Sequence, residues 1–375
     1  MRVAIVHDWL VTLRGGERVL EALLELFPHA EVFTLFHQPG ACGQNIDAHP
    51  IRTSWLNALP GARARHRMFL PLFPSAIERF DFSGFDLVVS SSHCVAKGVR
   101  VPMGVPHVSY VHAPMRYMWD LFDDYFGPGR ASLPIRAGAT LMRPFLQRWD
   151  RETASRPTHL IANSHHIAEK IEKAWGRKAN VVHPPVNVDR YSGHSLEGLG
   201  QGGYFLWVGA LAPYKRLDIV LDAVRATPFP LWVVGGGQDE ARLRRHAPPH
   251  VRWLGVVSDE ALGPLYRNAR ALVFPGEEDF GITPLEALAC GRPVIALAKG
   301  GALETLTPEV AVFFDEPTPE ALLSALHRFE QFQKTFSPNA ARARALQFGK
   351  ARFLEEMRRQ FREAEVEFPA ASAKC

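Results

Sequence analysis

The stretch Val273–Thr305, VFPGEEDFGITPLEALACGRPVIALAKGGALET, decides how this chain folds. It opens on an apolar run and returns to one at Pro293–Leu297. Both runs have the composition of buried strands, although runs this short also fit a core helix. Between them Thr283 can cap a helix, Pro284 suits its first position, and Gly291 suits the left-handed backbone after its end. The stretch therefore predicts a strand–loop–helix–strand unit of a parallel sheet, whose helix begins where ligands bind in such sheets.

The loop before this helix carries groups that suit a sugar phosphate. N–H groups near Gly281, Ile282 and Thr283, together with the positive end of the helix, favour an anion such as phosphate. Glu278 stands before the helix and Glu286 on its first turn, so two carboxylates can flank the anion and bind hydroxyl groups, for example of a sugar and a ribose. The alternative is that Glu278 is a solvated loop residue and Glu286 only complements the helix dipole.

Two further motifs lie where predicted strands end. Gly15 and Gly16 open a helix after the first strand, where their N–H groups can approach a phosphate, although paired glycines also form plain turns. Lys215 and Arg216 follow the predicted strand Tyr204–Gly209 and can clamp a diphosphate. The alternative for this cation pair is a solvated basic turn.

A glycine run at 235–237 also follows a predicted strand. The GxGxxG spacing of dinucleotide-binding proteins fails here, because position 240 is a glutamate. A dehydrogenase is therefore disfavoured. His112 ends the predicted strand His107–His112, and active sites of such sheets collect at strand ends, although a lone histidine is more often structural.

Length and composition indicate a globular protein with two domains. The chain has 375 residues, of which 47% are hydrophobic and 22% charged, with a formal net charge of +4. Its four cysteines lack CxxC spacing, which argues against a zinc site or a disulfide framework and fits a reducing cytosol. No signal peptide or transmembrane stretch is apparent, so a cytoplasmic location is expected.

The segment 192–203, SGHSLEGLGQGG, is rich in glycine and serine and predicts a linker between the domains. Arg342–Ala364 predicts one long helix with a charged face. Two stretches, Trp55–Phe80 and Arg130–Arg156, mix arginines with large apolar residues. Such stretches can lie at an anionic membrane surface, and the alternative is ordinary domain structure with arginines in solvent.

Several motifs in order resemble one enzyme family. They are Glu278-x7-Glu286 with Phe280-Gly281 between and GRPV after it (291–294), YVHAPMRYMWD (110–120), and ANSHHIAEKI with VVHPPVNVDRY (162–171 and 181–191). These motifs resemble the retaining GT-B glycosyltransferases of family 4, and the resemblance covers almost the whole chain.

The resemblance implies an α/β protein of GT-B architecture, with two Rossmann-like domains facing across a cleft. Residues 1–191 would form an acceptor-binding domain, 192–203 the linker, and 204–345 a nucleotide-sugar-binding domain. Residues 346–375 would supply a C-terminal helix that crosses back to the first domain.

The resemblance also implies a role for each candidate residue. The cations and helix amides would bind the donor diphosphate, the glutamates the donor's sugars, and the histidine the transferred sugar or the developing charge. The diphosphate would bind to Lys215, Arg216, Gly281, Ile282 and Thr283, and Gly15 and Gly16 would face it. Glu286 would bind the ribose and Glu278 the transferred sugar. His112 would contact the transferred sugar or the developing charge. Many family members carry an arginine where this chain has Ala210, so the assignment of Arg216 is less secure than that of Lys215.

The implied activity is transfer of a sugar from a nucleotide sugar with retention of configuration. No Asp-x-Asp occurs in the chain, so no divalent metal is expected, and positive charges with the helix dipole would stabilise the leaving nucleoside diphosphate. The opening IVHDW (5–9) with HAPMRYMWD (112–120) resembles bacterial mannosyltransferases of surface polysaccharide synthesis.

This closer resemblance favours GDP-mannose over UDP- or ADP-sugars as the donor. It also favours a glycan or lipid-linked acceptor, presented at the inner face of the plasma membrane. A nucleic-acid partner is not expected. An epimerase or phosphorylase of the same architecture, and a non-catalytic protein that binds sugar nucleotides, stay as alternatives.

Overall fold

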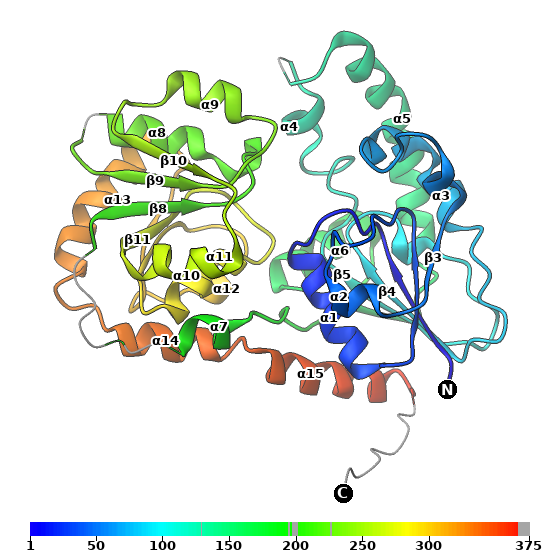
Figure 1. The fold of residues 1–375 in the computed structure, drawn as a ribbon. Coiled ribbons are helices and arrows are strands. Elements are labelled where there is room, and N and C mark those ends of the chain that lie inside the picture. The colour runs from blue at the N-terminus through cyan, green and yellow to red at the C-terminus, as the bar shows by residue number, and fades with distance from the viewer. Residues whose placement is uncertain (129, 194–195, 197–201, 226, 367–375) are drawn as a thin grey trace, which may run out of the picture. The chain divides into compact units, whose positions relative to one another are not determined.

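The computed structural model describes residues 1–128, 130–193, 196, 202–225 and 227–366, which form two compact units (Figure 1). Unit 1 contains Met1–Pro185 and the C-terminal residues from Ala351, and unit 2 contains Val186–Lys350. Within the predicted linker, residues 194, 195 and 197–201 lie outside the described residues, as do residues 367–375 of the predicted C-terminal segment.

Unit 1 is built on a seven-stranded parallel sheet in the order β3-β2-β1-β4-β5-β6-β7. Its strands are β1 (Val3–His7), β2 (Glu31–Thr34), β3 (Ile51–Thr53), β4 (Leu87–Ser92), β5 (His107–Val111), β6 (His159–Ala162) and β7 (Asn180–Val181). Apolar side chains alternate along β1, with Val3 and Ile5 in one buried cluster and Ala4 and Val6 in the cluster on the other face. Both faces are therefore covered, as expected of a parallel sheet.

The helices of unit 1 cover those two faces. They are α1 (Gly15–Leu26), α2 (Gln44–Asp47), α3 (Phe73–Ile77), α4 (Phe122–Phe126), α5 (Leu133–Thr153), α6 (His165–Trp175) and α15 (Lys350–Glu363), with 3₁₀ helices at Trp55–Ala58, His66–Leu72 and Ala96–Gly98. Ser164 caps α6 by accepting a hydrogen bond from the Ile167 N–H. No helix in the described ranges is both long and apolar enough to cross a bilayer.

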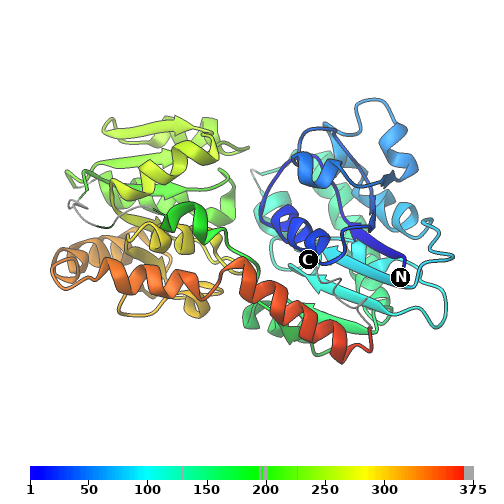
Figure 2. The same cartoon turned by 60° about the horizontal axis from the view of Figure 1, so that its bottom comes forward.

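The prediction of a single helix over Arg342–Ala364 is wrong. Two helices, α14 (Pro338–Leu346) and α15, occupy this region and are separated by three residues (Figure 2). At the break Phe348 is buried in the core of unit 2, and its carbonyl oxygen accepts the Val186 N–H at 3.0 Å. The helix is interrupted between α14 and α15 because the Phe348 carbonyl oxygen pairs with Val186 instead of with a helical N–H group. Phe353 and Phe361 of α15 then pack into the α1 face of unit 1.

Unit 2 repeats the plan with a six-stranded parallel sheet in the order β10-β9-β8-β11-β12-β13. Its strands are β8 (Tyr204–Val208), β9 (Leu231–Val234), β10 (Val251–Gly255), β11 (Ala269–Phe274), β12 (Val294–Leu297) and β13 (Ala311–Phe314). Its helices are α7 (Val188–Ser192), α8 (Leu217–Arg225), α9 (Glu240–His246), α10 (Asp259–Arg267), α11 (Ile282–Ala289), α12 (Ala302–Thr305), α13 (Pro319–Phe332) and α14, with a 3₁₀ helix at Pro213–Lys215. The predicted α/β fold with two Rossmann-like domains is confirmed.

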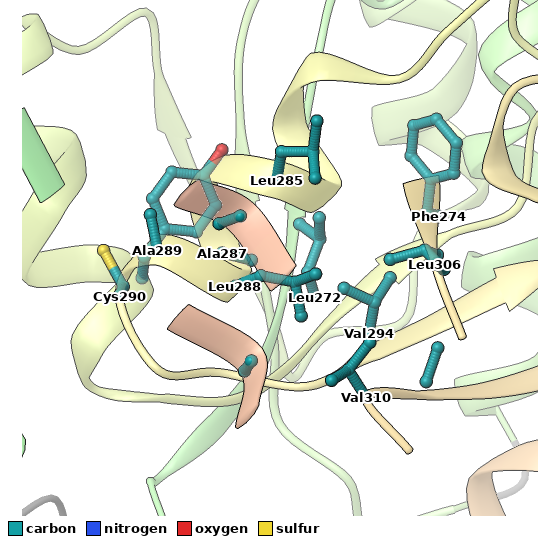
Figure 3. Close-up of a cluster of buried hydrophobic side chains, with 14 of the residues drawn as sticks. Leu272, Phe274, Leu285, Ala287, Leu288, Ala289, Cys290, Val294, Leu306 and Val310 are labelled. Atoms are coloured by element: carbon teal, nitrogen blue, oxygen red, sulfur yellow. The ribbon is translucent and has the colours of Figure 1, made fainter. Parts of the chain in front are cut away.

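The strand–loop–helix–strand unit predicted from Val273–Thr305 is present as β11–α11–β12. Figure 3 shows Leu285 and Leu288 of α11 in one buried cluster with Leu272 and Val294 of the two strands. This apolar packing fixes α11 against the sheet.

Thr283, however, does not cap α11. The helix begins at Ile282 after Gly281, whose φ of 89° is left-handed, and a Cβ at Gly281 would lie 3.2 Å from the Phe274 ring. Because glycine allows both this backbone and this close approach, the helix starts earlier than the predicted cap. Gly291 has the predicted left-handed backbone, with φ of 73°.

Candidate functional site

In each unit the chain first adds two strands on one side of its first strand and then crosses to add the remaining strands on the other side. In unit 2 this switch point lies between β8 and β11, and in unit 1 between β1 and β4. Loops that leave the carboxyl ends of such strand pairs line the ligand sites of open α/β sheets. Most of the predicted site residues follow β8, β11 or β1, so the topology places them at these two points.

Lys215 and Glu278 are brought together at the switch point of unit 2. Lys215 ends the 3₁₀ helix after β8, Glu278 lies in the loop after β11, and their side chains form an ion pair. Each side chain is 15% exposed. A charge pair this far from solvent is screened less than a surface pair, so it holds both groups in place.

Glycines allow the two loops to touch. A Cβ at Gly276 would lie 2.6 Å from the Tyr214 carbonyl oxygen, so the loop after β11 runs directly against the 3₁₀ helix. On its other side, the Gly301 N–H donates to the Glu278 carbonyl oxygen at 2.8 Å, and a Cβ at Gly301 would collide with Phe280. The backbone that carries Glu278 is therefore held from both sides.

Glu286 lies on the second turn of α11, where Tyr266 orients it. The Tyr266 hydroxyl donates to Glu286 Oε2 at 2.8 Å, and the tyrosine itself is fully buried. Burial and the nearby Glu286 carboxylate raise the Tyr266 pKa well above its usual value, so the hydroxyl keeps its proton and stays a donor. One carboxylate oxygen of Glu286 is therefore held by a hydrogen bond from the protein itself.

Gly281, Ile282 and Thr283 form the start of α11, in the same loop as Glu278. The first N–H groups of an α-helix have no acceptor within the helix, and the helix dipole makes that end positive. Arg216 is placed differently. It takes a left-handed backbone, with φ of 50°, and its Nε lies 3.2 Å from Asp218 Oδ1. The cation pair of the sequence therefore divides, with Lys215 turned to Glu278 and Arg216 to Asp218.

The switch point of unit 1 contains His112 and Gly16 together with residues that the sequence did not single out. His112 Nε2 lies 2.9 Å from Ser91 Oγ, which lies 3.1 Å from His7 Nδ1. A Cβ on Gly16 would touch both imidazole rings, at 3.5 Å from His7 Cε1 and 3.7 Å from His112 Nε2. Glu17 follows on α1, with Oε1 3.6 Å from His7 Nε2.

Asp8 joins this cluster to the backbone that follows β4. Its buried carboxylate accepts four backbone N–H groups, those of residues 93–96, and lies 3.1 Å from His93 Nδ1. Burial and the neighbouring histidines lower the pKa values of His93 and His112 well below the usual 6.5. His112 is therefore neutral near pH 7 and acts as a hydrogen-bonding group rather than as a cation. The signal available in the sequence was polar residues at two strand ends, His7-Asp8 and Ser91-Ser92-His93.

Two family profiles match the chain. One, described as Glycosyltransferase Family 4, matches residues 13–190, and the other, described as Glycosyl transferases group 1, matches residues 198–345. The chain is 30% identical over 202 residues to the D-rhamnosyltransferase WbpZ of Pseudomonas aeruginosa, a match that covers 50% of this chain and 51% of that protein. It is 34% identical over 168 residues to the O-antigen chain mannosyltransferase C of Escherichia coli, covering 43% of this chain and 45% of that protein. The matched regions thus span about half the length of these curated relatives.

Solved structures match over nearly the whole chain. Sucrose-phosphate synthase from Thermosynechococcus elongatus aligns with a TM-score of 0.74 and 16% identity, covering 97% of this chain and 99% of that one. Anabaena HepE in complex with UDP and glucose aligns with a TM-score of 0.69 and 18% identity, covering 96% and 99%. At this identity the likeness establishes the fold of the chain.

Proposed function

We propose that this chain, which carries a Glycosyltransferase Family 4 domain followed by a group 1 glycosyl transferase domain, is a retaining glycosyltransferase that works without a metal ion. It moves a hexosyl group from a nucleotide sugar to a glycan or lipid-linked acceptor in surface polysaccharide synthesis. GDP-mannose is the proposed donor.

The ion pair between Lys215 and Glu278 carries this proposal. Lys215 is a point charge paired with Glu278 in the loop that leads into α11, so we assign the diphosphate to this cation and to the N–H groups at the start of the helix. Glu278 can then turn to the hydroxyl groups of the transferred sugar. Glu286, whose carboxylate Tyr266 orients, is the proposed partner of the ribose.

In the proposed reaction the bond from the anomeric carbon to the diphosphate oxygen breaks while the acceptor hydroxyl oxygen bonds to that carbon from the same face, and the hydroxyl proton passes to the departing diphosphate oxygen. The leaving diphosphate gains negative charge, which Lys215 and the α11 dipole stabilise; Arg216 is the proposed second cation. Both glutamates bind the donor, and neither acts as a hydrolase acid or base. His112, neutral and hydrogen-bonded to Ser91, is the proposed hydrogen-bonding partner of a sugar hydroxyl.

GDP-mannose is supported by the similarity to the O-antigen chain mannosyltransferase of Escherichia coli. The alternative is a UDP- or ADP-sugar donor, and the UDP and glucose bound to Anabaena HepE favour UDP within that group. A second alternative is a protein of the same fold that binds a sugar nucleotide without turnover.

A thermal-shift panel of GDP-, UDP- and ADP-sugars in EDTA tests the proposal. A donor that binds the folded state raises the melting temperature by an amount that grows with its concentration over its dissociation constant. We expect GDP-mannose to raise it and EDTA to leave the shift unchanged. A shift only with a UDP- or ADP-sugar would contradict GDP-mannose as the donor. A shift that EDTA abolishes would contradict the proposal that no metal ion is needed. No shift with any donor at millimolar concentration would contradict the proposed donor site.

Contact with an anionic membrane is a further part of the proposal. On α5 the apolar side chains of Leu133, Leu141 and Phe145 face solvent, at 79%, 79% and 53% exposure. The Arg148 side chain on the same helix is 80% exposed. An apolar face flanked by arginines suits the boundary between acidic lipid headgroups and their acyl chains. In the stretch Trp55–Phe80, Met68 is 71% exposed.

A further inference from the structure

One face of helix α5 holds the backbone that follows β5. Arg143 donates from Nε to the Met118 carbonyl oxygen at 3.0 Å and from Nη2 to the Trp119 carbonyl oxygen at 3.3 Å. Gln147 Nε2 donates to the same Met118 oxygen at 2.8 Å. Asp150 Oδ2 accepts the Trp119 indole N–H at 2.8 Å. Three residues spaced four and three apart, on one face of the helix, therefore hold Met118 and Trp119.

The backbone that α5 holds continues directly into the candidate site of unit 1. The segment 113–121 joins these contacts to His112 at the end of β5, and its Met115 and Met118 side chains are buried. Arg116 lies in the same segment. After burial and the neighbouring histidines, the charge of Arg116 also lowers the pKa of His112, so this guanidinium lies near the histidine cluster. The position of the segment therefore affects the candidate site.

The opposite face of α5 is exposed to solvent. Leu141, Phe145 and Arg148 are exposed, and each stands two residues before one of the residues that hold the segment. Two residues correspond to about 200° around an α-helix, so the two sets lie on opposite faces. From residue 133 to residue 149 the helix carries three arginines and no acidic residue. An apolar face with this charge complements a membrane of acidic lipids.

The first half of α5 has little packing of its own. From residue 133 to residue 141 every side chain except that of Ala139 is exposed, and the run contains Pro134 and Gly138. Pro144, further along, lacks the N–H group that would close a helical hydrogen bond. A helical stretch this short, without a buried face, is marginal in water. Burial of its apolar side chains in a membrane would therefore stabilise it.

We propose that contact of the exposed face of α5 with an acidic membrane stabilises the segment 113–121 in the form that the structure shows, with Arg143 and Gln147 as positioning residues. A membrane that stabilises the helix around Leu141 and Phe145 also fixes the backbone from which the two positioning side chains extend. The coupling is reciprocal, so a more stable segment also strengthens membrane binding. This inference rests on the membrane contact proposed above and does not depend on the transferase activity.

Hydrogen exchange of the full chain, followed by mass spectrometry, measures the coupling without substrate. Vesicles of phosphatidylglycerol and phosphatidylcholine should slow exchange of the 113–121 amides in the wild type about fivefold or more, as expected of two coupled sites. They should also slow exchange in the first turns of α5. Vesicles of phosphatidylcholine alone lack acidic headgroups and should slow neither region.

The double variant Arg143→Lys with Gln147→Met removes the contacts to the segment and keeps the membrane face. Lysine keeps the positive charge but lacks the planar fork that reaches two carbonyl oxygens, and methionine keeps the length of glutamine without its N–H groups. The double variant should sediment with acidic vesicles like the wild type. Its 113–121 amides should exchange about tenfold faster, because hydrogen bonds that hold the segment are lost, and should no longer respond to vesicles.

Arg177→Lys is the matched control. Arg177 also donates to two backbone carbonyl oxygens of unit 1, those of Ala154 and Pro157, which lie outside the segment. This variant should keep the full response to vesicles. Sedimentation of the wild type without slower exchange of the segment would overturn the coupling, and so would equal slowing in the double variant. A wild type that does not sediment with acidic vesicles would overturn the membrane contact and the coupling together.

Sugar transfer from GDP-mannose tests the proposed activity separately. If transfer is found, acidic vesicles should raise its rate in the wild type and not in the double variant. A segment that responds to vesicles in a protein that transfers no sugar would refute the proposed activity and keep the coupling. Transfer by a protein whose segment does not respond to vesicles would refute the coupling and keep the activity.

Discussion

The ammonium group of Lys215 is paired with the carboxylate of Glu278 at the switch point of the unit 2 sheet. The proposed function gives these groups different parts of the donor, the diphosphate and the transferred sugar. In the structure the two charges neutralise each other. A bound donor would replace this ion pair with two new contacts, one between Lys215 and the diphosphate and one between Glu278 and the sugar. Both groups enter the bound state from a fixed position, so little ordering is required when the donor binds.

We expect Lys215→Ala to weaken binding of the nucleoside diphosphate about ten- to a hundredfold. A hydrogen bond to a charged group contributes about 1.5–3 kcal/mol, and this variant removes the charge partner of the phosphates. The measurement is calorimetric titration with GDP in EDTA, followed by the transfer rate with GDP-mannose, which should fall sharply.

Two variants separate binding from folding in that experiment. Lys215→Ala leaves the Glu278 carboxylate without this partner and should lower the melting temperature, whereas Lys215→Ala with Glu278→Ala should recover part of it without recovering affinity. Lys334→Ala, an exposed lysine bonded to Gln331 on α13, should change neither quantity. Wild-type affinity in Lys215→Ala would remove this residue from the site.

Tyr266→Phe should reduce nucleotide affinity through Glu286. The variant removes one hydroxyl group and its 2.8 Å hydrogen bond, so the carboxylate loses the group that orients it toward the proposed ribose. We expect a loss of about 1 kcal/mol in stability and a several-fold rise in the dissociation constant of GDP. Tyr204→Phe is the matched control, because it removes a hydrogen bond to the Leu265 carbonyl in the same unit. Equal affinity losses in the two variants would show a general effect of stability, not a role for Glu286.

The fold was predictable where a single segment carries the signal. Val273–Thr305 contains two apolar runs and a helix start within one stretch, and its helix needed only a correction at Gly281. Short edge elements were not predicted. β3, Ile51–Thr53, has three residues and two of them are exposed, so no apolar pattern marks it. The break between α14 and α15 depends on Phe348 packing against distant residues, which propensity along the chain does not show.

The candidate site was predictable as a set of residues but not as a set of contacts. Lys215 and Glu278 were both singled out, yet their pairing depends on β8 lying beside β11. His112 was singled out from its strand end, while Glu17 and Ser91 became visible only when β1, β4 and α1 were assembled. Contacts between residues far apart in sequence require the strand order, which no local pattern supplies.

Buried histidines should make the stability of the protein fall with acid before its carboxylates are protonated. Burial, with the charges of Lys97 and Arg156, lowers the pKa of His107 to about 3, from 6.5. Below pH 6.5 the unfolded chain binds a proton that folded His107 does not, so stability present above that pH is lost as the pH falls. For this residue the loss between pH 7 and pH 5 is about 2 kcal/mol. His93 and His112, whose pKa values are also lowered, act in the same direction.

Denaturant unfolding at pH 7, 6 and 5 measures this slope. His107→Gln keeps a polar group for Ser90 and cannot titrate, so its stability should fall less steeply than that of the wild type. His246→Gln, at an exposed position on α9, should keep the wild-type slope. The pKa values of Glu17 and Asp47 are lowered from 4.5 and 3.8, so their contributions are lost below this window. A wild-type slope in His107→Gln would contradict the burial of a neutral histidine.

The exposed apolar face of α5 should bind acidic membranes. Leu141→Ser with Phe145→Ser removes two large solvent-facing side chains, and because no packed core is disturbed, the melting temperature should change little. We expect the variant to sediment less with vesicles containing phosphatidylglycerol. The matched control is Met103→Ser, which removes a fully exposed apolar side chain from the turn before β5, outside the arginine-rich stretches. If α5 inserts, the α5 variant loses binding and Met103→Ser does not. Trimming Arg63, Arg65 and Arg67 to alanine should also weaken binding at low salt. Equal sedimentation of all variants would leave α5 as a solvent-exposed helix without a membrane role.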